Sequence, residues 1–252
     1  MKTLLFYLLF LNPIFLFSIQ LGPSKVTELK NFYHFQDVLI NPARATGMEK
    51  FAFNTAPEIG TFIAYLAGEY EIDTVIETGT HKASTTSYFA HIFDEVHTIE
   101  ILEDSFNKCK DTLKKMPHVT CHLGTSETVL EEILPNLAHK PVLFYLDAHW
   151  FSSWPLLKEL SAITKTHKDN CVIVIDDCKV PGRPDIPFDR YKQQDLSLEY
   201  VKPRFETLFT NYVIYYLIPR NVGSKAKLVA IPEAFHRRDL MVHCAQTLDN
   251  PA

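Results

Sequence analysis

The chain has 252 residues, of which 46% are hydrophobic and 22% charged, a composition that is typical of a globular protein and excludes the disordered and fibrous classes. Thirty acidic against 25 basic residues give a net charge of −5, which argues against a nucleic-acid-binding protein, because such proteins carry a basic surplus. The five cysteines show no CxxC spacing, which favours free thiols over structural zinc or a disulfide framework; they are Cys109, Cys121, Cys171, Cys178 and Cys244.

Residues 1–20 form a hydrophobic leader. Lys2 precedes a largely apolar run over 4–17, which is typical of the n-region and h-region of a secretory signal peptide. The run is shorter than the ~20 residues of a membrane span, and residues 17–22 lack a small-x-small cleavage pattern. A signal peptide, a membrane anchor and a buried N-terminal helix are therefore the three interpretations. Residues 21–55 show no clear period and are expected to form an arm that packs on the domain.

From residue 56 the pattern becomes regular, and we expect one domain over 56–233 followed by a tail over 234–252. Residues 57–70 have apolar side chains at helical spacing, and after them short apolar runs alternate with longer helix-patterned segments. The expected strands are 72–77, 96–101, 119–123, 142–147, 172–176, 212–218 and 227–231. The expected helices after 57–70 are 84–93, 103–115, 126–137, 155–166 and 197–209.

The strand order follows from the composition of these runs and from the connections between them. Continuous apolar runs such as VLFYL and VIVI suit strands that are buried on both faces, as in a parallel sheet covered by helices. Residues 220–226, between the last two strands, are too few for a helix, so these strands should form an antiparallel hairpin. The sequence therefore predicts an α/β fold with a Rossmann-like, doubly wound, seven-stranded sheet, mostly parallel with one antiparallel strand in a C-terminal hairpin.

Polar residues follow five of the expected strands, at the edge where ligands bind in sheets of this kind. Four of these five strands end in acidic residues, which is more than the general polarity of loops explains. In chain order, the residues at this edge are Glu77, Gly79, Thr80, His81, Glu100, Gly124, Thr125, Ser126, Asp147, His149, Asp176 and Asp177. The sequence predicts a binding site there.

Five stretches at these strand ends carry a family resemblance: VIETGTHKASTTSYFA, EVHTIEI, VTCHLGTS, VLFYLDAHW and VIVIDDC. Together they resemble class I S-adenosylmethionine-dependent methyltransferases, and within them the small-molecule O-methyltransferase branch that resembles macrocin O-methyltransferases and cephalosporin hydroxylase-like proteins. The resemblance runs from about residue 58 to residue 232. The first motif departs from the family, because Ala83 stands where a later glycine is common and His81 and Lys82 add bulk.

The resemblance implies S-adenosylmethionine as the cofactor, and the chemistry of that molecule explains the residue types. Gly79 lets backbone amides approach the amino-acid part of the cofactor closely. Glu100 can accept both ribose hydroxyls, and Thr125 and Ser126 lie where the family contacts adenine. The expected cofactor-binding residues are Glu77, Gly79, Thr80, Glu100, Thr125, Ser126 and Asp147. The alternatives are a helix N-cap for Ser126 and a solvated strand end for Glu100.

Three carboxylates at neighbouring strand ends would repel one another without a cation, which points to Mg²⁺ held by Asp147, Asp176 and Asp177. A bound cation would lower the pKa of an acceptor hydroxyl, and related metal-dependent methyltransferases carry acids at the same strand ends. Asp147 and His149 are the expected catalytic residues, with His149 as the general base. The alternatives are that Asp147 binds the cofactor and that Asp177 pairs with Lys179.

A small-molecule acceptor is expected to lie between aromatic residues and a long loop. The aromatic residues are Trp150, Phe151 and Trp154, for which core packing is the alternative. The loop spans 179–195 and contains three prolines, and an ordered loop of this length beside a site is typical of a lid. Its expected substrate contacts are Arg183, Arg190 and Tyr191.

The sequence thus predicts an S-adenosylmethionine-dependent methyltransferase that acts on a hydroxyl of a small molecule with metal assistance. The alternative is a catalytically degenerate relative that only binds. The leader and the missing glycine favour it, because S-adenosylmethionine is made in the cytosol and a secreted copy would lack the cofactor. For the location, the leader suggests secretion or membrane anchoring, whereas the cysteine usage and the cofactor supply suggest the cytoplasm. A nicotinamide-dependent oxidoreductase is disfavoured, because Thr80, His81 and Lys82 stand where its G-x-G-x-x-G turn needs glycines.

Overall fold

The computed structural model describes residues 5–8, 15–18, 48–148, 154–219 and 223–235. The chain divides into two units, residues 1–44 and 45–252. In the first unit β1 (Leu5–Leu8) and β2 (Phe15–Ser18) pair antiparallel, so the described part of the leader is a hairpin and not a helix. Across the described ranges, no helix combines the length and the apolar character that a membrane crossing requires. The predicted arm is described only from residue 48 onward, and the predicted tail only at 234 and 235.

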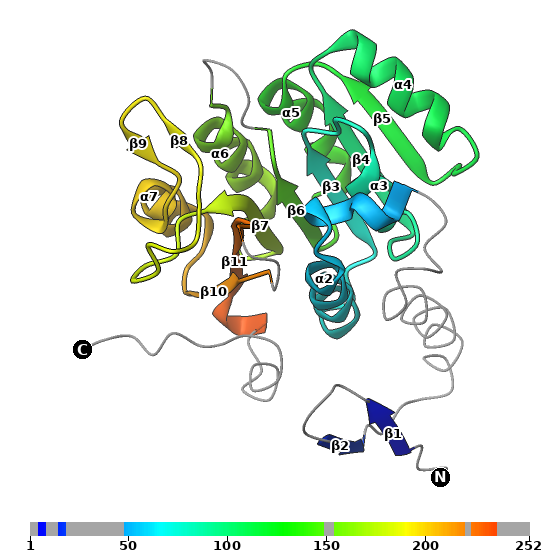
Figure 1. Ribbon diagram of the computed structural model, residues 1–252. Coiled ribbons are helices and arrows are strands. Elements are labelled where there is room, and N and C mark those ends of the chain that lie inside the picture. The colour runs from blue at the N-terminus through cyan, green and yellow to red at the C-terminus, as the bar shows by residue number, and fades with distance from the viewer. Residues whose placement is uncertain (1–4, 9–14, 19–47, 149–153, 220–222, 236–252) are drawn as a thin grey trace. The chain divides into compact units, whose positions relative to one another are not determined.

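The second unit contains a seven-stranded sheet in the order β10-β11-β7-β6-β3-β4-β5 (Figure 1). Its strands are β3 (Thr74–Thr78), β4 (Glu95–Glu100), β5 (Val119–Leu123), β6 (Val142–Leu146), β7 (Cys171–Cys178), β10 (Tyr212–Leu217) and β11 (Ala226–Pro232). The pairs among β3 to β7 are all parallel, whereas β11 is antiparallel to both β7 and β10. The predicted fold class is confirmed, including the reversed strand in the C-terminal hairpin.

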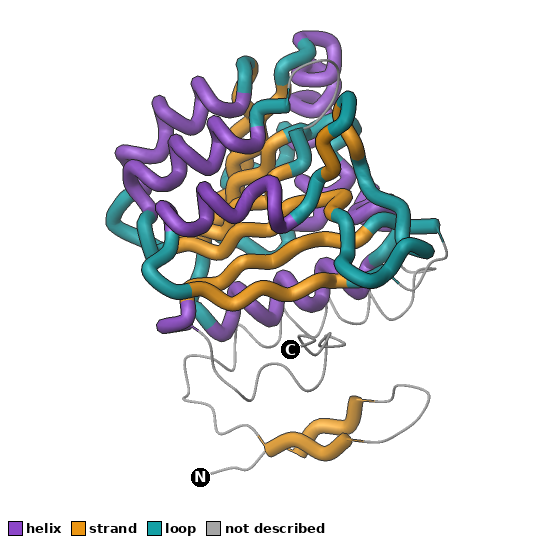
Figure 2. The backbone as a smooth tube through the Cα atoms, turned by 90° about the vertical axis from the view of Figure 1, so that its left-hand side faces the viewer, coloured by secondary structure: helices purple, strands orange, loops and turns teal. Residues whose placement is uncertain are grey.

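Helices cover both faces of this sheet (Figure 2). They are α2 (Pro57–Glu69), α3 (Ser84–Phe89), α4 (Glu103–Leu113), α5 (Ser126–Leu137), α6 (Leu156–His167) and α7 (Leu198–Leu208), with the short 3₁₀ segments η2 (Met48–Asn54) and η3 (Glu233–Phe235). On one face α5, α6 and α7 form a single apolar cluster with alternate strand residues such as Ile76, Phe144 and Ile173. The predicted helices are all present, and the largest shift is at α3, which ends at Phe89 where the pattern predicted 93.

The strand residues next to those in sequence point to the opposite face of the sheet, where they pack against η2 and α3. The ring of Phe53 lies 4.9 Å from that of Tyr88, 5.6 Å from that of Phe89 and 5.7 Å from that of Tyr145, all edge to face. Phe53 is only 1% exposed. The last part of the predicted arm is therefore part of the core of the domain.

Candidate active site

The turn after β3 crosses the end of β6 at close range. Gly79 has a φ angle of +85°, and a Cβ atom there would lie 2.7 Å from the carbonyl oxygen of Asp147. The Gly79 amide donates a hydrogen bond to the carbonyl of Ile99 at 2.9 Å, and the Asp147 amide donates to the carbonyl of Thr78 at 3.1 Å. Only glycine combines this positive φ with this close approach, so Gly79 joins the ends of β3, β4 and β6 at one point.

The departure from the family at residues 81–83 affects the side chains more than the backbone. His81 has a φ angle of +48° and Ala83 one of +60°, so Ala83 keeps a left-handed conformation that glycine adopts more easily. Ala83 is the N-cap of α3 and is buried, whereas His81 and Lys82 are exposed. The bulky side chains of His81 and Lys82, which were expected beside the ligand, therefore lie largely in solvent.

Glu77, the penultimate residue of β3, lies in a buried cluster of hydroxyl groups. Its Oε2 accepts hydrogen bonds from Thr86 Oγ1 and, at 2.7 Å, from Thr98 Oγ1. Thr80 Oγ1 lies 2.6 Å from Thr98 Oγ1, which ties that predicted residue to the same cluster. Burial raises the pKa of Glu77 from 4.5 to about 7, because the two hydroxyl hydrogen bonds only partly replace hydration. No lysine or arginine of the described ranges contacts this carboxyl group.

Glu100 ends β4, and both of its carboxylate oxygens accept backbone amides. Oε2 accepts from the amide of His81 at 2.8 Å, and Oε1 accepts from the amide of Leu102 at 2.9 Å. The side chain is 7% exposed, so the interpretation of a solvated strand end is wrong. Apolar side chains surround this position: Ile101 is 59% exposed, and Leu123, the partner of Glu100 in the β4–β5 register, is 47% exposed.

The third strand end places two hydroxyl groups differently from the prediction. Thr125, and not Ser126, is the N-cap of α5, so the N-cap interpretation of Ser126 is wrong. Thr125 Oγ1 donates to Thr128 Oγ1 at 2.9 Å. Ser126 is 6% exposed, and its hydroxyl has no hydrogen-bond partner within the part of the chain that the structure describes. Buried hydroxyls are normally satisfied, so this one is available to a ligand.

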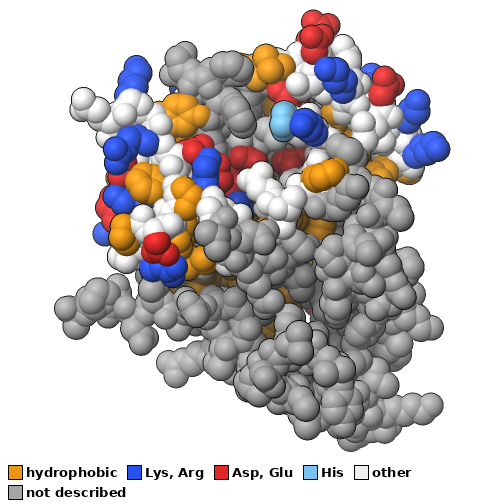
Figure 3. Space-filling model, in the orientation of Figure 1, with side chains coloured by type: hydrophobic (Ala, Val, Ile, Leu, Met, Phe, Trp, Pro, Cys, Tyr) orange, Lys and Arg blue, Asp and Glu red, His pale blue; other side chains and the backbone are white. Residues whose placement is uncertain are grey.

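The acids at the end of β7 lie among lysines. Figure 3 shows acidic side chains grouped in the middle of this face with basic ones beside them. Lys227 of β11 is fully buried and forms an ion pair with Asp176 Oδ1, and Tyr145 donates its hydroxyl to Asp176 Oδ2 at 2.5 Å. Lys225 Nζ donates to Asp177 Oδ2 at 2.7 Å and also to Asp189. Burial disfavours the charged form of Lys225, but the two carboxylates outweigh this effect and raise its pKa.

This arrangement corrects the predicted metal site. The oxygens of Asp176 and Asp177 that would coordinate Mg²⁺ are bound by two ammonium groups and a phenol hydroxyl. In the described ranges, no group of three or more His, Cys, Asp or Glu residues has a geometry that could hold a metal ion. The donor set therefore does not fit a divalent cation. Lys225 and Lys227 were missed, although a lysine inside the apolar run AKLVAIP is a signal that could have indicated a buried partner.

The predicted acceptor loop contains β8 (Arg190–Tyr191) and β9 (Gln194–Asp195), which pair antiparallel. Tyr191 lies beside Trp154, with ring centroids 4.9 Å apart, and Trp154 stacks on Tyr200 at 4.6 Å. Tyr191, a predicted substrate contact, and Trp154, a predicted wall residue, thus lie side by side, and Trp154 also packs against the apolar core, which was its alternative.

The two predicted arginine contacts are engaged within the loop itself. Arg183 forms an ion pair with Asp185 at 2.6 Å, and Arg190 forms one with Asp195. Lys179 also pairs with Asp195, at 2.8 Å, so the alternative pairing of Lys179 with Asp177 is wrong. The other predictions near this loop, His149, Trp150 and Phe151, lie outside the described residues.

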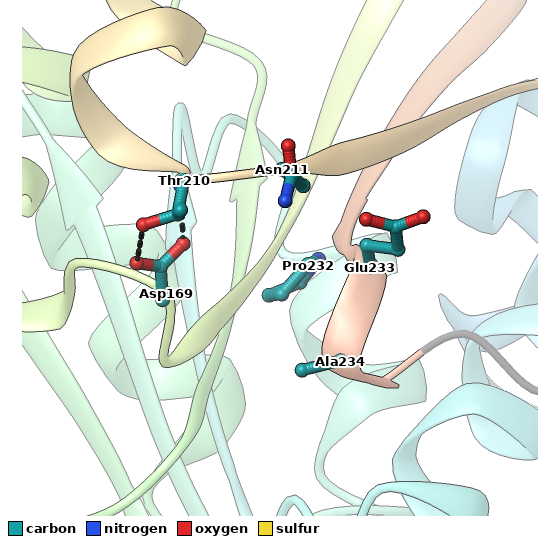
Figure 4. Close-up of a pocket in the computed structure, with 6 residues that line it drawn as sticks. All are labelled: Asp169, Thr210, Asn211, Pro232, Glu233 and Ala234. Carbon is teal, nitrogen blue, oxygen red and sulfur yellow. Dashed lines mark hydrogen bonds between the residues drawn. The ribbon is translucent and has the colours of Figure 1, made fainter.

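A shallow depression lies at the opposite edge of the sheet (Figure 4). It is lined by Asp169, Thr210, Asn211, Pro232, Glu233 and Ala234. Asp169 precedes β7 and accepts hydrogen bonds from the amide and hydroxyl of Thr210 at 2.5 and 2.6 Å. This depression is therefore separate from the edge where the parallel strands end.

Comparison with known proteins identifies the fold. No protein-family model matches the chain, and neither does the sequence of any curated protein. Among solved structures, an O-methyltransferase from Bacillus cereus in complex with SAH matches with a TM-score of 0.53 at 16% identity, over 84% of this chain and 93% of that one. The O-methyltransferase TomG from Streptomyces achromogenes, in complex with SAM, matches with a TM-score of 0.50 at 16% identity, over 85% and 91%. A putative O-methyltransferase from Klebsiella pneumoniae matches with a TM-score of 0.50 at 17% identity, over the same shares. The chain therefore has the class I methyltransferase fold that the resemblance implied.

Proposed function

We propose that this chain is an S-adenosylmethionine-dependent methyltransferase that acts on a hydroxyl group of a small molecule. The cofactor supplies an activated methyl group on a sulfonium, and it also carries an ammonium, a carboxylate, a ribose diol and an adenine. The observation that supports the proposal best is the pair Glu77 and Glu100, two buried carboxyl groups beside the Gly79 turn. In the described ranges their hydrogen-bond partners are all neutral hydroxyls or backbone amides.

These two carboxyl groups suit the cationic and hydroxyl parts of the cofactor. Each oxygen of Glu100 accepts one amide hydrogen bond and keeps a further lone pair, so the carboxylate can accept the two ribose hydroxyls. Because the pKa of Glu77 is about 7, its carboxyl group can be charged or protonated at neutral pH, and a cationic ligand beside it favours the charged form. The expected role of the Gly79 amide is corrected: it donates to the carbonyl of Ile99, and the space that a Cβ atom would take is filled by the backbone of Asp147, so Gly79 shapes the turn and does not bind the amino-acid part itself.

The adenine is proposed to lie over the ends of β4 and β5. Exposed Ile101 and Leu123 offer an apolar surface for the base, and burying that surface is favourable. Ser126 contributes a buried hydroxyl without a partner in the described ranges, which suits a ring nitrogen or an exocyclic amine. The residues of this half of the edge therefore suit the ammonium, the ribose diol and the adenine of the cofactor.

The acceptor is proposed to lie at the ends of β6 and β7, against Trp154 and Tyr191. There Asp147 or His149 would take the proton of the acceptor hydroxyl, since a positioned base within hydrogen-bond reach speeds such a step. The remaining task of the protein is to hold the two reacting groups in line.

The test is a calorimetric titration of the full chain with S-adenosylmethionine, followed by a methyl-transfer assay on a panel of sugar and phenol acceptors. The wild type should bind, and Gly79→Val should abolish binding because its Cβ collides with the backbone of Asp147. Glu100→Ala should weaken binding by about 1–3 kcal/mol, the cost of leaving polar groups unpaired. Glu103→Ala is the matched control, because it removes the same charge from an exposed position three residues along.

Equal affinity in all four proteins would contradict the assignment of the cofactor site. Binding without turnover on any acceptor would instead favour the degenerate relative, because that alternative keeps the cofactor half and loses the chemistry.

A further inference from the structure

The strand β7 breaks its alternation at the two acids. In a regular strand, neighbouring side chains point to opposite faces of the sheet. Here Ile175 pairs with Leu228 and Cys178 pairs with Ala226, so Asp176 and Asp177 together lie opposite the single residue Lys227. This is a β-bulge, and Asp177 has the left-handed φ angle of +59° that such bulges often require.

The bulge brings both acids near Lys227, and it brings Asp177 near Lys225 as well. Lys227 Nζ pairs with Asp176 Oδ1 and lies 3.9 Å from Asp177 Oδ1. Lys225 Nζ bridges Asp177 and Asp189, and the carbonyl of Lys225 accepts a hydrogen bond from Lys227 Nζ at 3.2 Å. Two ammonium groups thus meet three carboxylates.

We propose that Lys225 and Lys227 take the place of a divalent cation at this edge. Together they carry the +2 charge of such an ion, and they bind carboxylate oxygens that a hard cation would coordinate. The inference deepens the proposed function, since it makes the acceptor half of that site independent of metal. It does not depend on that function for its test, because cation binding is measured without a methyl donor.

The two lysines differ in how they can be tested. Lys227 is fully buried, so its removal threatens the fold. The side chain of Lys225 is 32% exposed and reaches the acids from the open side. Lys225→Met therefore vacates one cation position with the smaller structural cost, and Lys225→Arg keeps a cation there as the matched control.

The experiment compares thermal melts of the full chain in EDTA and in millimolar Mg²⁺. The melting temperature of the wild type and of Lys225→Arg should not respond to Mg²⁺. Lys225→Met should melt at a lower temperature in EDTA and recover part of that loss in Mg²⁺, because an ion that binds only the folded state stabilises it. The double variant Lys225→Met with Asp177→Asn should lose this recovery.

Two results would overturn the inference. One is a Mg²⁺-dependent rise in the wild-type melting temperature that Asp177→Asn abolishes, because Mg²⁺ would then bind at this edge although both lysines are present. The other is a folded Lys225→Met variant whose melting temperature does not change when Mg²⁺ is added.

If Lys225→Met does not fold, the wild type is titrated with Mn²⁺, and the free ion is measured by its paramagnetic resonance. Mn²⁺ binding that needs Asp177 overturns the inference, and no binding supports it. Failure of S-adenosylmethionine binding in calorimetry would affect the proposed function alone.

Discussion

The two halves of the strand-end edge hold their carboxyl groups in opposite ways. At the ends of β3 and β4, Glu77 and Glu100 are held by hydroxyl groups and backbone amides. At the end of β7, Asp176 and Asp177 are held by the ammonium groups of Lys227 and Lys225. Both sets are buried, so the difference lies in the charge of the partners and not in exposure.

This difference indicates which ligand each half suits. Neutral donors leave the charge of these carboxyl groups to be set by a ligand: the pKa of Glu77 is raised to about 7 by burial, and a cationic ligand beside it favours its charged form. Ammonium groups cancel most of the charge, so the β7 half favours a neutral ligand. A sulfonium cofactor and an uncharged hydroxyl acceptor correspond to this division.

The largest expected effect is on the lysine-paired half. Lys227→Met should lower the free energy of unfolding by about 3–5 kcal/mol, because it leaves buried Asp176 without its cation. Urea unfolding measures this loss. Adding Asp176→Asn to Lys227→Met should restore most of it, since the buried charge is then gone. Lys165→Met is the control: its pair with Glu131 is exposed, and the change should stay below about 1 kcal/mol. Equal losses in the buried and exposed variants would show that Lys227 does not compensate a buried charge on Asp176.

A smaller effect is expected for Glu77, and it depends on pH. Its folded pKa of about 7 lies above its ordinary value of 4.5, so the folded state binds the proton more tightly than the unfolded state. The stability that this proton provides is complete below pH 4.5 and is lost as the pH rises to about 7, by up to about 3 kcal/mol. Glu77→Gln should lack this loss.

The measurement is urea unfolding of both proteins at pH values from 4 to 8. His122 acts in the opposite direction, because burial and His97 lower its pKa from 6.5 to about 4 and stability falls with acidification in that range. This contribution is common to both proteins and cancels in their difference. A difference that stays constant from pH 4.5 to 7 would show that Glu77 titrates normally.

The smallest effect concerns the thiols, whose modification tests access to the two halves. Cys121 of β5 is half-buried, and the hydrogen bond with Cys109, at 3.4 Å between the sulfurs, lowers its pKa. Cys171 and Cys178 of β7 are fully buried, and burial raises the pKa of each. Native alkylation read by peptide mass spectrometry should therefore label Cys121 well before Cys171 or Cys178. In denaturant all three should react alike. Early native labelling of Cys171 would contradict the packing of the β7 half.

The sequence predicted the fold well because its signals are local. Continuous apolar runs identified the parallel strands, and a connection too short for a helix identified the reversed one. A tight turn at Gly79 could be predicted for the same reason, because glycine adopts a positive φ angle easily. The close approach of Asp147 to Gly79 could not, because it joins distant segments. The predicted residues Glu77, Glu100 and Ser126 do lie at the strand ends, although their roles remain proposals.

The charge partners could not be predicted, because they depend on contacts between distant segments. The pairing of Asp177 with Lys225 spans 48 residues and needs a bulge that shifts the register of β7 against β11. Proximity in sequence suggested Lys179 as the partner of Asp177. Three acids for which the sequence showed no other partner suggested a metal ion. The N-cap of α5 was misplaced by one residue because Thr125 and Ser126 both have the required hydroxyl.

The position of β11 in the chain also bears on how the domain folds. β11 is the last strand of the sheet in sequence, yet it inserts between β7 and β10. Contacts of long sequence separation close slowly, because the entropy of the intervening loop is lost before they form. Until β11 docks, the acids of β7 carry uncompensated charge beside an open sheet edge, so their ion pairs with Lys225 and Lys227 form only when this long-range contact forms. Salt should slow that docking, because screening weakens the attraction between the lysines of β11 and the acids of β7.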